Sequence, residues 1–425
     1  MKKKSAAQSA FFNLRVLIGT SLVVAGVLLG GLGLSQFSAQ AQPSNSAASN
    51  SINPLVPEGF DCSQIRGLGI DRQENLRAGA IMIYCGQAAG GSASAFSESY
   101  PITQQLLAPL AYGGADVDLI TGAESFPNVT QSETMTAANP DNPLEVVVAY
   151  NDSRGLNAVP INISGASVST DGGATFTRLT TTGGQSPFSN TFGDPVIMYH
   201  KPDATWYTVW LDAAAGGQGL GGYKSATPSN PNSWTHFTVH NNSSDDRESG
   251  WADNNPASPH FGRMYVSWND FNVGGGALFV SFSDDGSTWT PVQITTGVPF
   301  VRNVQITGDL SGNGVVYIAG MDEGGGGFPH NDINKIYKST NGGATWTNTY
   351  SGPAFPGPGV TAVGYFACMF LDNGGYWRHE GWGEPAAFND VVHLVYAQHG
   401  AGSDAGDVFY IRSTDGGVTL AHPSS

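Results

Sequence analysis

One phrase of eight residues recurs along the chain and constrains the fold more than any other feature. The phrase Ser-Thr-Asp-Gly-Gly-Ala-Thr-Phe at Ser169–Phe176 returns with small changes at Ser339–Trp346 and at Ser413–Leu420. A fourth copy at Ser283–Trp289 is one residue shorter, with Asp284 counted as its acid. The spacing indicates a unit of roughly 57 residues with one degenerate copy and one insertion, which is typical of stacked or circular repeats.

Each repeat also contains a run of alternating β-branched and aromatic residues that ends in an acid or an amide. Runs of this kind, bounded by Gly, Asn and Pro, predict strands, and shorter strand-like runs flank them. The five runs are Val148–Asp152, Thr208–Asp212, Val266–Asp270, Ile318–Asp322 and Leu394–Gln398. Short antiparallel strands repeated around a circle predict an all-β fold, a β-propeller of four-stranded antiparallel blades over residues 131–425. A β-sandwich is the alternative, although its turns need not repeat one string of residues.

The composition agrees with a chain that is rich in turns and poor in helix. The 425 residues include 57 Gly and 24 Pro, and only 12% of them are charged. The formal net charge of −16 argues against nucleic acid and anionic membranes as partners, because both require clustered cations. We expect a monomer with a small or polymeric ligand of another chemical class.

The first 41 residues have the pattern of a secretory signal peptide. Basic residues at Lys2–Lys4 and Arg15 precede the apolar run Val16–Leu34, and Ala39–Ala41 offers a small-x-small cleavage site. An uncleaved membrane anchor is the alternative, because the apolar run is about long enough to span a bilayer. Cleavage after Ala41 predicts a secreted protein, extracellular or periplasmic.

Two further segments precede the repeats. Residues 42–56 are rich in Ser, Asn, Ala and Pro and predict a flexible leader. Residues 57–130 form an N-terminal segment in which Cys62 and Cys85 can pair in an oxidising compartment, with Cys368 left over.

The repeated phrase resembles the Asp box, also called the bacterial neuraminidase repeat (BNR), of the sialidase superfamily of secreted β-propellers. The phrases Gly193-Asp-Pro195 and Arg263–Trp268 are similar to secreted bacterial members of that superfamily. The resemblance implies a turn between the third and fourth strands of a blade, in which an Asp side chain accepts backbone N–H groups and Gly supplies a positive φ. It therefore implies structural roles for Asp171, Asp284, Asn341 and Asp415.

The resemblance implies a six-bladed wheel, whereas five blades are visible in the sequence. Two explanations stand open. A strand at Ala78–Cys85 closes the last blade from the N-terminal side, or the chain is truncated at its C-terminal end and lacks a blade.

In such a propeller the innermost strands start, and the second strands end, at the face opposite the Asp boxes. We expect any functional site at this rim. The residues that the repeat places there are Glu133, Asp194, Glu248, Arg302 and Glu384, followed by Asp152, Asp212, Asp270, Asp322 and Gln398.

Carboxylates at this rim suit glycoside hydrolysis, which needs two carboxyl groups, one with a raised pKa. The candidate catalytic residues are Asp194, Glu380 and Glu384. Trp377 and Trp382 are candidates for stacking on sugar rings, within a polar and aromatic cluster denser than packing requires.

The resemblance to sialidases also implies three arginines that hold a substrate carboxylate. Arg154, Arg302 and Arg378 are the available trio, and guanidinium groups meet a carboxylate through two parallel hydrogen bonds. However, the Phe/Tyr-Arg-Ile-Pro motif that opens sialidase propellers is absent, and no Tyr matches their nucleophile.

Two functions remain open at this point. The first is a glycan-binding propeller that hydrolyses sialosides or other glycosides, and the second is a non-catalytic extracellular binding or scaffold module. We predict no cofactor and no assigned metal ligand. A ring of carboxylates can hold Ca²⁺, but the chain has no Asp-x-Asp-x-Asp-Gly loop.

Overall fold

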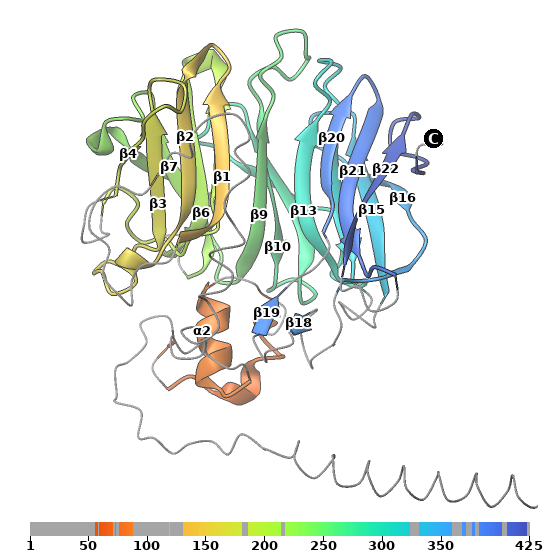
Figure 1. Ribbon diagram of the computed structural model, residues 1–425, viewed down its shortest axis with the longest axis horizontal. Helices are drawn as coiled ribbons and strands as arrows, with labels where there is room; N and C mark the ends of the chain where they lie inside the picture. The colour runs from red at the N-terminus through yellow and green to blue at the C-terminus, as the bar shows by residue number, and fades with distance from the viewer. Residues whose placement is uncertain are drawn as a thin grey trace, which may run out of the picture. The chain divides into compact units, whose positions relative to one another are not determined.

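The alternating runs of the sequence form the strands of a five-bladed β-propeller (Figure 1). The computed structural model describes residues 56–57, 59–70, 73, 76–87, 119, 131–180, 186–213, 217–323, 331–358, 368–370, 376–378, 382–401 and 406–422. The predicted all-β architecture is confirmed, with five blades in these residues rather than the six that the resemblance implied. The predicted signal peptide lies outside the described residues, as does the leader apart from Val56.

The first four blades are antiparallel sheets whose strands follow chain order from the innermost strand outward. Blade 1 contains β1 (Gln131–Asn139), β2 (Asn142–Asp152), β3 (Ser164–Ser169) and β4 (Thr177–Arg178). Blade 2 contains β5 (Val196–His200), β6 (Thr205–Asp212), β7 (Gly219–Ser225) and β8 (Thr235–His240). Blade 3 contains β9 (Asp245–Ala252), β10 (Met264–Asp270), β11 (Ala277–Ser283) and β12 (Thr290–Gln293). Blade 4 contains β13 (Val301–Gly308), β14 (Val316–Asp322), β15 (Asn331–Ser339) and β16 (Thr347–Ser351), with β17 (Phe355–Pro356) also paired to β15.

Blade 5 is a sheet of three strands, β20 (Glu384–Phe388), β21 (Val391–Gln398) and β22 (Asp407–Ser413). An isolated bridge between Arg412 and Ala421 lies at its outer edge, where a fourth strand would pair. A separate hairpin pairs β18 (Cys368–Phe370) with β19 (Tyr376–Arg378). The innermost strands β1, β5, β9, β13 and β20 contact one another in turn, which places the start of each beside the start of the next.

The hydrophobic core lies between successive blades, not within one sheet. One cluster joins Val147 of blade 1 to Trp206 of blade 2, and another joins Val209 of blade 2 to Trp268 of blade 3. Two further clusters join blade 3 to blade 4 and blade 4 to blade 5. Because the apolar side chains of each sheet alternate between its two faces, one blade is buried by both of its neighbours.

Residues 76–84 form helix α2 (Leu76–Tyr84), so the proposed closing strand at Ala78–Cys85 is wrong. Among the described side chains of α2, Ala78, Ile81 and Met82 are buried. This spacing is helical, but a short apolar run in the sequence does not by itself distinguish a helix from a strand. A disulfide between Cys62 and Cys85 joins the ends of this segment. The other helices are short 3₁₀ turns, η1 (Cys62–Gln64), η3 (Ser153–Gly155), η4 (Lys201–Asp203) and η6 (Pro231–Ser233). Among the described residues, no helix has the length and apolar character needed to cross a membrane.

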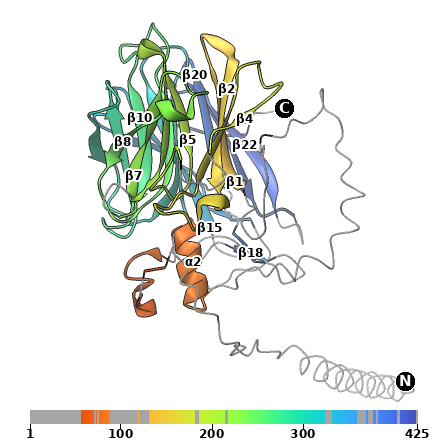
Figure 2. The same cartoon turned by 90° about the vertical axis from the view of Figure 1, so that its left-hand side faces the viewer.

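The N-terminal segment packs on loops of blades 2 and 3. The Gln73 side chain donates to Ser244 Oγ at 3.0 Å and receives a hydrogen bond from Gln218 Nε2 at 3.4 Å. A Cβ on Gly69 would lie 2.6 Å from the Phe271 ring, so glycine lets the two surfaces meet. Figure 2 shows α2 at the end of the strands, away from the outer edges of the blades.

The repeated phrase forms the turn that leaves the third strand of a blade. Asp171 Oδ1 accepts from the Thr175 backbone N–H at 2.9 Å, and Ser169 Oγ accepts from the Gly173 N–H at 2.8 Å. The turns at Ser339 and Ser413 repeat these contacts through Asn341 and Asp415.

The fourth copy requires a correction, because its structural acid is Asp285 and not Asp284. Asp285 Oδ1 accepts from the backbone N–H groups of Ser287 and Thr288 at 2.8 and 2.7 Å. Asp284 instead forms an ion pair with Arg263, with two N–O distances of 2.7 Å. Asp285 follows Ser283 by two positions, as the acid or amide follows the serine in the other copies. The residue that this copy lacks comes after the acid, so its loss does not change that spacing.

Candidate functional site

The innermost strands share an irregularity where they begin. A residue with left-handed backbone stands there in four blades, namely Glu133 (φ 51°), Asp194 (φ 58°), Arg247 (φ 61°) and Asn303 (φ 53°). Shifts of register accompany Glu133, Arg247 and Asn303, as expected for β-bulges. Non-glycine residues rarely adopt this conformation, and its repetition at one rim makes this rim the candidate site.

The strand registers fix which end of the blade this is. In blade 1, Gln131 pairs with Asp152, and Val146 at the other end of β2 pairs with Ser169. The starts of the innermost strands and the ends of the second strands therefore lie at one rim, and the repeated turns lie at the other. The predicted division of the two rims is what the registers show.

A cavity of about 380 Å³ opens at this rim, between the first residues of the innermost strands. It is lined by Glu133, Thr134, Met135, Asp194, Pro195, Val196, Arg247, Glu248, Ser249, Gln305 and Glu384. The lining includes four carboxylic acids, contributed by blades 1, 2, 3 and 5. A volume of this size is typical of sites for small ligands.

Two of the acids, Glu133 and Asp194, are joined through Asn151 near the end of β2. Asn151 Nδ2 donates to Glu133 Oε2 at 3.1 Å and to Asp194 Oδ1 at 3.2 Å, while Asn151 Oδ1 accepts from the Asp194 N–H at 2.6 Å. Burial raises the pKa of Asp194 well above its usual range, and the Glu133 charge raises it further. The pair therefore holds a proton on Asp194 beside the Glu133 carboxylate. A Cβ on Gly193 (φ 92°) would lie 2.3 Å from Asn151 Oδ1, so the residue before Asp194 must be glycine.

The third acid, Glu248, is 7% exposed, and neither of its carboxyl oxygens has a hydrogen-bond partner. Burial raises its pKa well above the usual range, and the charges of Asp246 and Glu133 add to the effect. Burial therefore favours the neutral form of Glu248. A buried neutral carboxylic acid that lines a cavity can donate a proton to a ligand there.

Arg247 and Glu384 complete the charged lining. Arg247 Nη2 donates to Asn303 Oδ1 at 3.0 Å, and its guanidinium carbon lies 4.4 Å from the centre of the Trp382 ring. Glu384 is solvent-exposed at the mouth, where desolvation by the surrounding protein raises its pKa and the Arg247 charge lowers it. Of the described residues that line the cavity, Arg247 is the one with a positive charge.

Two of the three predicted arginines, Arg154 and Arg302, do not line this cavity. Arg302 is buried, with its Nη2 2.9 Å from Asp246 Oδ2, and Arg154 Nε lies 3.3 Å from Asp152 Oδ2. Arg378 lies in β19, and its side chain is outside the described residues. Arg302 comes directly before Asn303, and Asp246 comes directly before Arg247, and both of these following residues have left-handed backbone. The bulges of the two neighbouring blades therefore turn Arg302 and Asp246 toward each other. Arg154 and Arg302 therefore lie outside the described lining of this cavity, and their role as substrate-binding residues stays a prediction.

The other predicted residues divide between the cavity and its surroundings. Asp194 and Glu384 line the cavity, whereas Glu380 and the Trp377 side chain lie outside the described residues. Trp382 packs on Arg247, and its Nε1 donates to Glu323 Oε1 at 3.3 Å.

The acids and the amide that end the second strands are not among the described residues of the cavity lining. Two of these acids contact basic side chains instead, Asp212 next to His236 and Asp322 next to Lys335. The catalytic candidates chosen from the sequence omitted Glu133 and Glu248. In the sequence, the one feature that points to Glu133 and Glu248 is their position at the start of the innermost strands.

Comparison with known proteins gives similarities at the level of solved structures alone. No family model matches the sequence, and no curated protein matches it. The catalytic domain of a GH62 α-L-arabinofuranosidase from Coprinopsis cinerea is 13% identical, with a TM-score of 0.39, over 70% of this chain and 95% of that chain. An exo-1,5-α-L-arabinanase from a bovine ruminal metagenomic library is 13% identical, with a TM-score of 0.37, over 69% of this chain and 98% of that chain. CoXyl43, a GH43 β-xylosidase/α-arabinofuranosidase from a compost microbial metagenome, is 10% identical, with a TM-score of 0.38, over 69% and 94% of the two chains.

Proposed function

We propose that the protein is a glycoside hydrolase whose active site is the acidic cavity at the centre of the propeller. The observation that carries the proposal is Glu248, a buried acid without a hydrogen-bond partner, in one cavity with the Glu133–Asp194 pair. Glycoside hydrolysis needs two carboxyl groups in different protonation states. Glu248 and the Glu133–Asp194 pair have different surroundings in the cavity, which favours such a difference.

The residues divide the chemistry as follows. Glu248 gives its proton to the glycosidic oxygen as the bond from that oxygen to the anomeric carbon breaks. A water oxygen replaces the leaving group on the anomeric carbon, and Glu133, on the other side of the sugar, takes up the proton that this water loses. Asp194 keeps its proton and donates to Glu133, which holds that carboxylate in place and limits repulsion between the two acids. Asn151 fixes both of them through its amide.

The cavity favours an uncharged sugar as its substrate. Among the described residues of the lining, Arg247 is the one cation and its charge already acts on the carboxyl groups of Glu248 and Glu384, so these residues offer no cluster of arginines for a substrate carboxylate. This argues against the sialoside specificity that the resemblance implied, because Arg302 and Arg154 already pair with aspartates. Met135, Pro195 and Val196 supply apolar contacts for the C–H face of a sugar ring.

We further propose that the protein acts outside the cytoplasm. The disulfide between Cys62 and Cys85 supports this location, because such bonds persist in oxidising compartments. The predicted signal sequence is consistent with the same route of export.

The test is hydrolysis of a panel of neutral aryl glycosides and oligosaccharides, with sialosides included. We expect release of a neutral sugar by the wild type, and a loss of about 100-fold or more in kcat for Glu248→Gln, since general acid catalysis contributes about that much. Asp407→Asn, an exposed change on β22 outside the cavity, is the control and should leave kcat unchanged.

Binding of the same oligosaccharide to Glu248→Gln, measured by calorimetry, separates catalysis from recognition. Retained binding with lost turnover supports the role of Glu248 as the acid. If the wild type binds oligosaccharides but hydrolyses none of the panel, the protein is a binding module and the proposal fails.

A further inference from the structure

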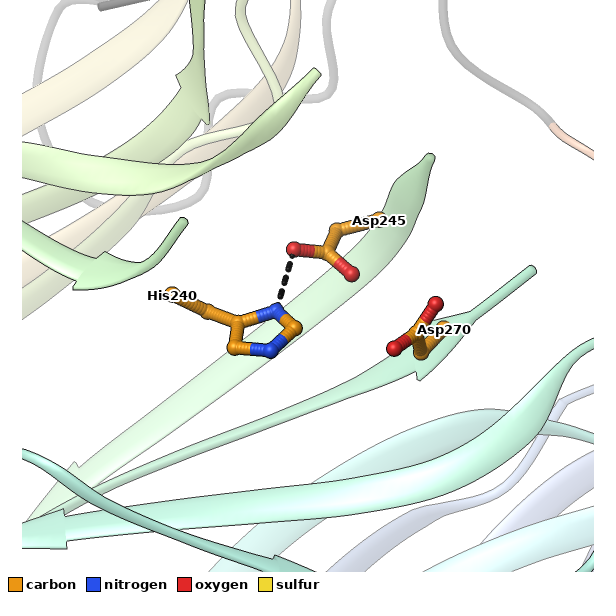
Figure 3. Close-up of side chains that lie close together, drawn as sticks. All are labelled: His240, Asp245 and Asp270. Atoms are coloured by element: carbon orange, nitrogen blue, oxygen red, sulfur yellow. Dashed lines mark hydrogen bonds and ion pairs between the residues drawn. The ribbon is translucent and has the colours of Figure 1, made fainter. Parts of the chain in front are cut away.

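A second cluster of ionisable residues lies outside the cavity, where blade 2 passes into blade 3. His240 ends β8, Asp245 begins β9 and Asp270 ends β10. One donor atom from each of the three side chains lies within 4.8 Å of the others. Figure 3 shows the two carboxyl groups and the imidazole ring converging from three strands.

Neighbouring groups hold each of these side chains in position. His240 Nδ1 lies 2.7 Å from Asp245 Oδ2, and its ring packs on Trp268 with 4.9 Å between the ring centres. Asp270 accepts from Asn242 Nδ2 and from the Asn272 backbone N–H, both at 2.8 Å. Outer hydrogen bonds of this kind orient the ligands of a metal site.

One carboxyl oxygen of Asp245 lacks a hydrogen-bond partner. Its side chain is fully buried, and Oδ1 has no hydrogen-bond partner. In Figure 3 the carboxyl oxygen that does not contact His240 is turned toward the side of Asp270. The indole Nε1 of Trp268, also buried, likewise has no hydrogen-bond partner.

The charges of the cluster do not balance. Asp245 and Asp270 are both buried, and His240 is the one basic side chain of the group. One imidazolium can offset only one of two carboxylates. A divalent cation would offset both and also supply a partner for Asp245 Oδ1.

We propose that His240, Asp245 and Asp270 bind a divalent cation of the zinc class. One imidazole nitrogen with two carboxylate oxygens suits Zn²⁺, whereas Ca²⁺ and Mg²⁺ favour oxygen ligands alone. The His240 side chain is 20% exposed, which leaves a path for the ion and for a water molecule as a further ligand.

The bound ion would act on the active-site rim through strand β9. Asp245 lies two residues before Arg247 and three before Glu248, both of which line the cavity. A cation that joins Asp245 to the end of β10 would fix the start of β9, and with it the bulge at Arg247.

The experiment uses the full folded protein, freed of metal with EDTA and dialysed at neutral pH. Zn²⁺ is titrated by calorimetry and by thermal unfolding, and Co²⁺ serves as a spectroscopic substitute. We expect one Zn²⁺ per chain, a higher Tm, and visible absorption from bound Co²⁺. Asp270→Asn and His240→Gln should each lose saturable Zn²⁺ binding and the Co²⁺ absorption.

His236→Gln is the matched control. It removes the neighbouring His236–Asp212 pair, whose His–Asp distance of 2.5 Å is also short but which belongs to no group of three donors among the described residues. We expect this variant to keep the full response to Zn²⁺. The proposal is overturned if the wild type binds no Zn²⁺, or if Asp270→Asn or His240→Gln binds it as the wild type does.

Discussion

At the scale of single residues, burial decides which acids of this chain are neutral. Glu248 and Asp171 show the two extremes. Burial raises the pKa of Glu248 well above its usual range, whereas hydrogen bonds from Thr175 and Ser169 lower the pKa of the exposed Asp171 to about 2. Burial therefore favours the protonated form of the acid in the cavity, and hydrogen bonds favour the carboxylate form of the acid in the turn at the opposite rim.

The pH dependence of stability tests this contrast. Glu248 keeps its proton in the folded protein after the unfolded chain has lost it, so its contribution is present below pH 4.5 and is lost as the pH rises toward its folded pKa. We expect Glu248→Gln to be increasingly more stable than the wild type from pH 5 to pH 8, measured by urea unfolding. Asp171→Asn should show the opposite sign, less stable at neutral pH and approaching the wild type as the pH falls toward 2. Parallel pH profiles for Glu248→Gln and the wild type would contradict the assignment.

At the scale of elements, the turns of the repeated phrase carry the clearest local energetics. In the turn between β11 and β12, Asp285 satisfies two backbone N–H groups, and Asp284 forms an ion pair near the surface with Arg263. Satisfying backbone donors in a turn is worth more than an exposed ion pair.

Alanine variants of the two adjacent acids distinguish their roles. We expect Asp285→Ala to lower the free energy of unfolding by about 1–2 kcal/mol, comparable to the loss of a cap. Asp284→Ala should cost at most about 1 kcal/mol, as is usual for an exposed pair. Chemical denaturation at neutral pH and moderate salt measures both, and an equal or larger loss for Asp284→Ala would refute the assignment.

The strands and their ends were predictable from the sequence, whereas the bulges and the helix were not. The alternating runs predicted the ends of β2, β6, β10, β14 and β21 at Asp152, Asp212, Asp270, Asp322 and Gln398, because a strand leaves a pattern of period two. A bulge adds one residue without any compositional sign, so the face to which Arg302 turns was not readable. The run from Ala78 to Tyr84 is apolar at positions that suit either a strand or a helix, and its burial at Ala78, Ile81 and Met82 follows the helical spacing.

At the scale of the whole molecule, successive blades share their cores, and the N-terminal segment has a small core of its own. That core contains Val56, Ile65, Ile70, Ala78, Ile81 and Met82. The segment is joined across 23 residues by the disulfide and rests on blades 2 and 3. Its stability therefore depends on the disulfide more than that of the blades does.

Removal of the disulfide should act locally. For Cys62→Ser/Cys85→Ser we expect the segment to lose about 3 kcal/mol of local stability, the value typical for a loop of this length. Hydrogen exchange should rise in residues 76–87 and stay low in β6 and β10. Equal increases in the segment and in the blades would show instead that the molecule unfolds as one unit.

The N-terminal segment contacts the residues on either side of the proposed cation site. Gln73 contacts Ser244, the residue before Asp245, and Gly69 meets Phe271, the residue after Asp270. The Phe271 ring in turn lies 5.8 Å from the guanidinium carbon of Arg302. The segment thus holds the backbone next to both Asp245 and Asp270 in place. A chain that begins at residue 131 would lack these two contacts and would leave the Phe271 ring exposed on that side.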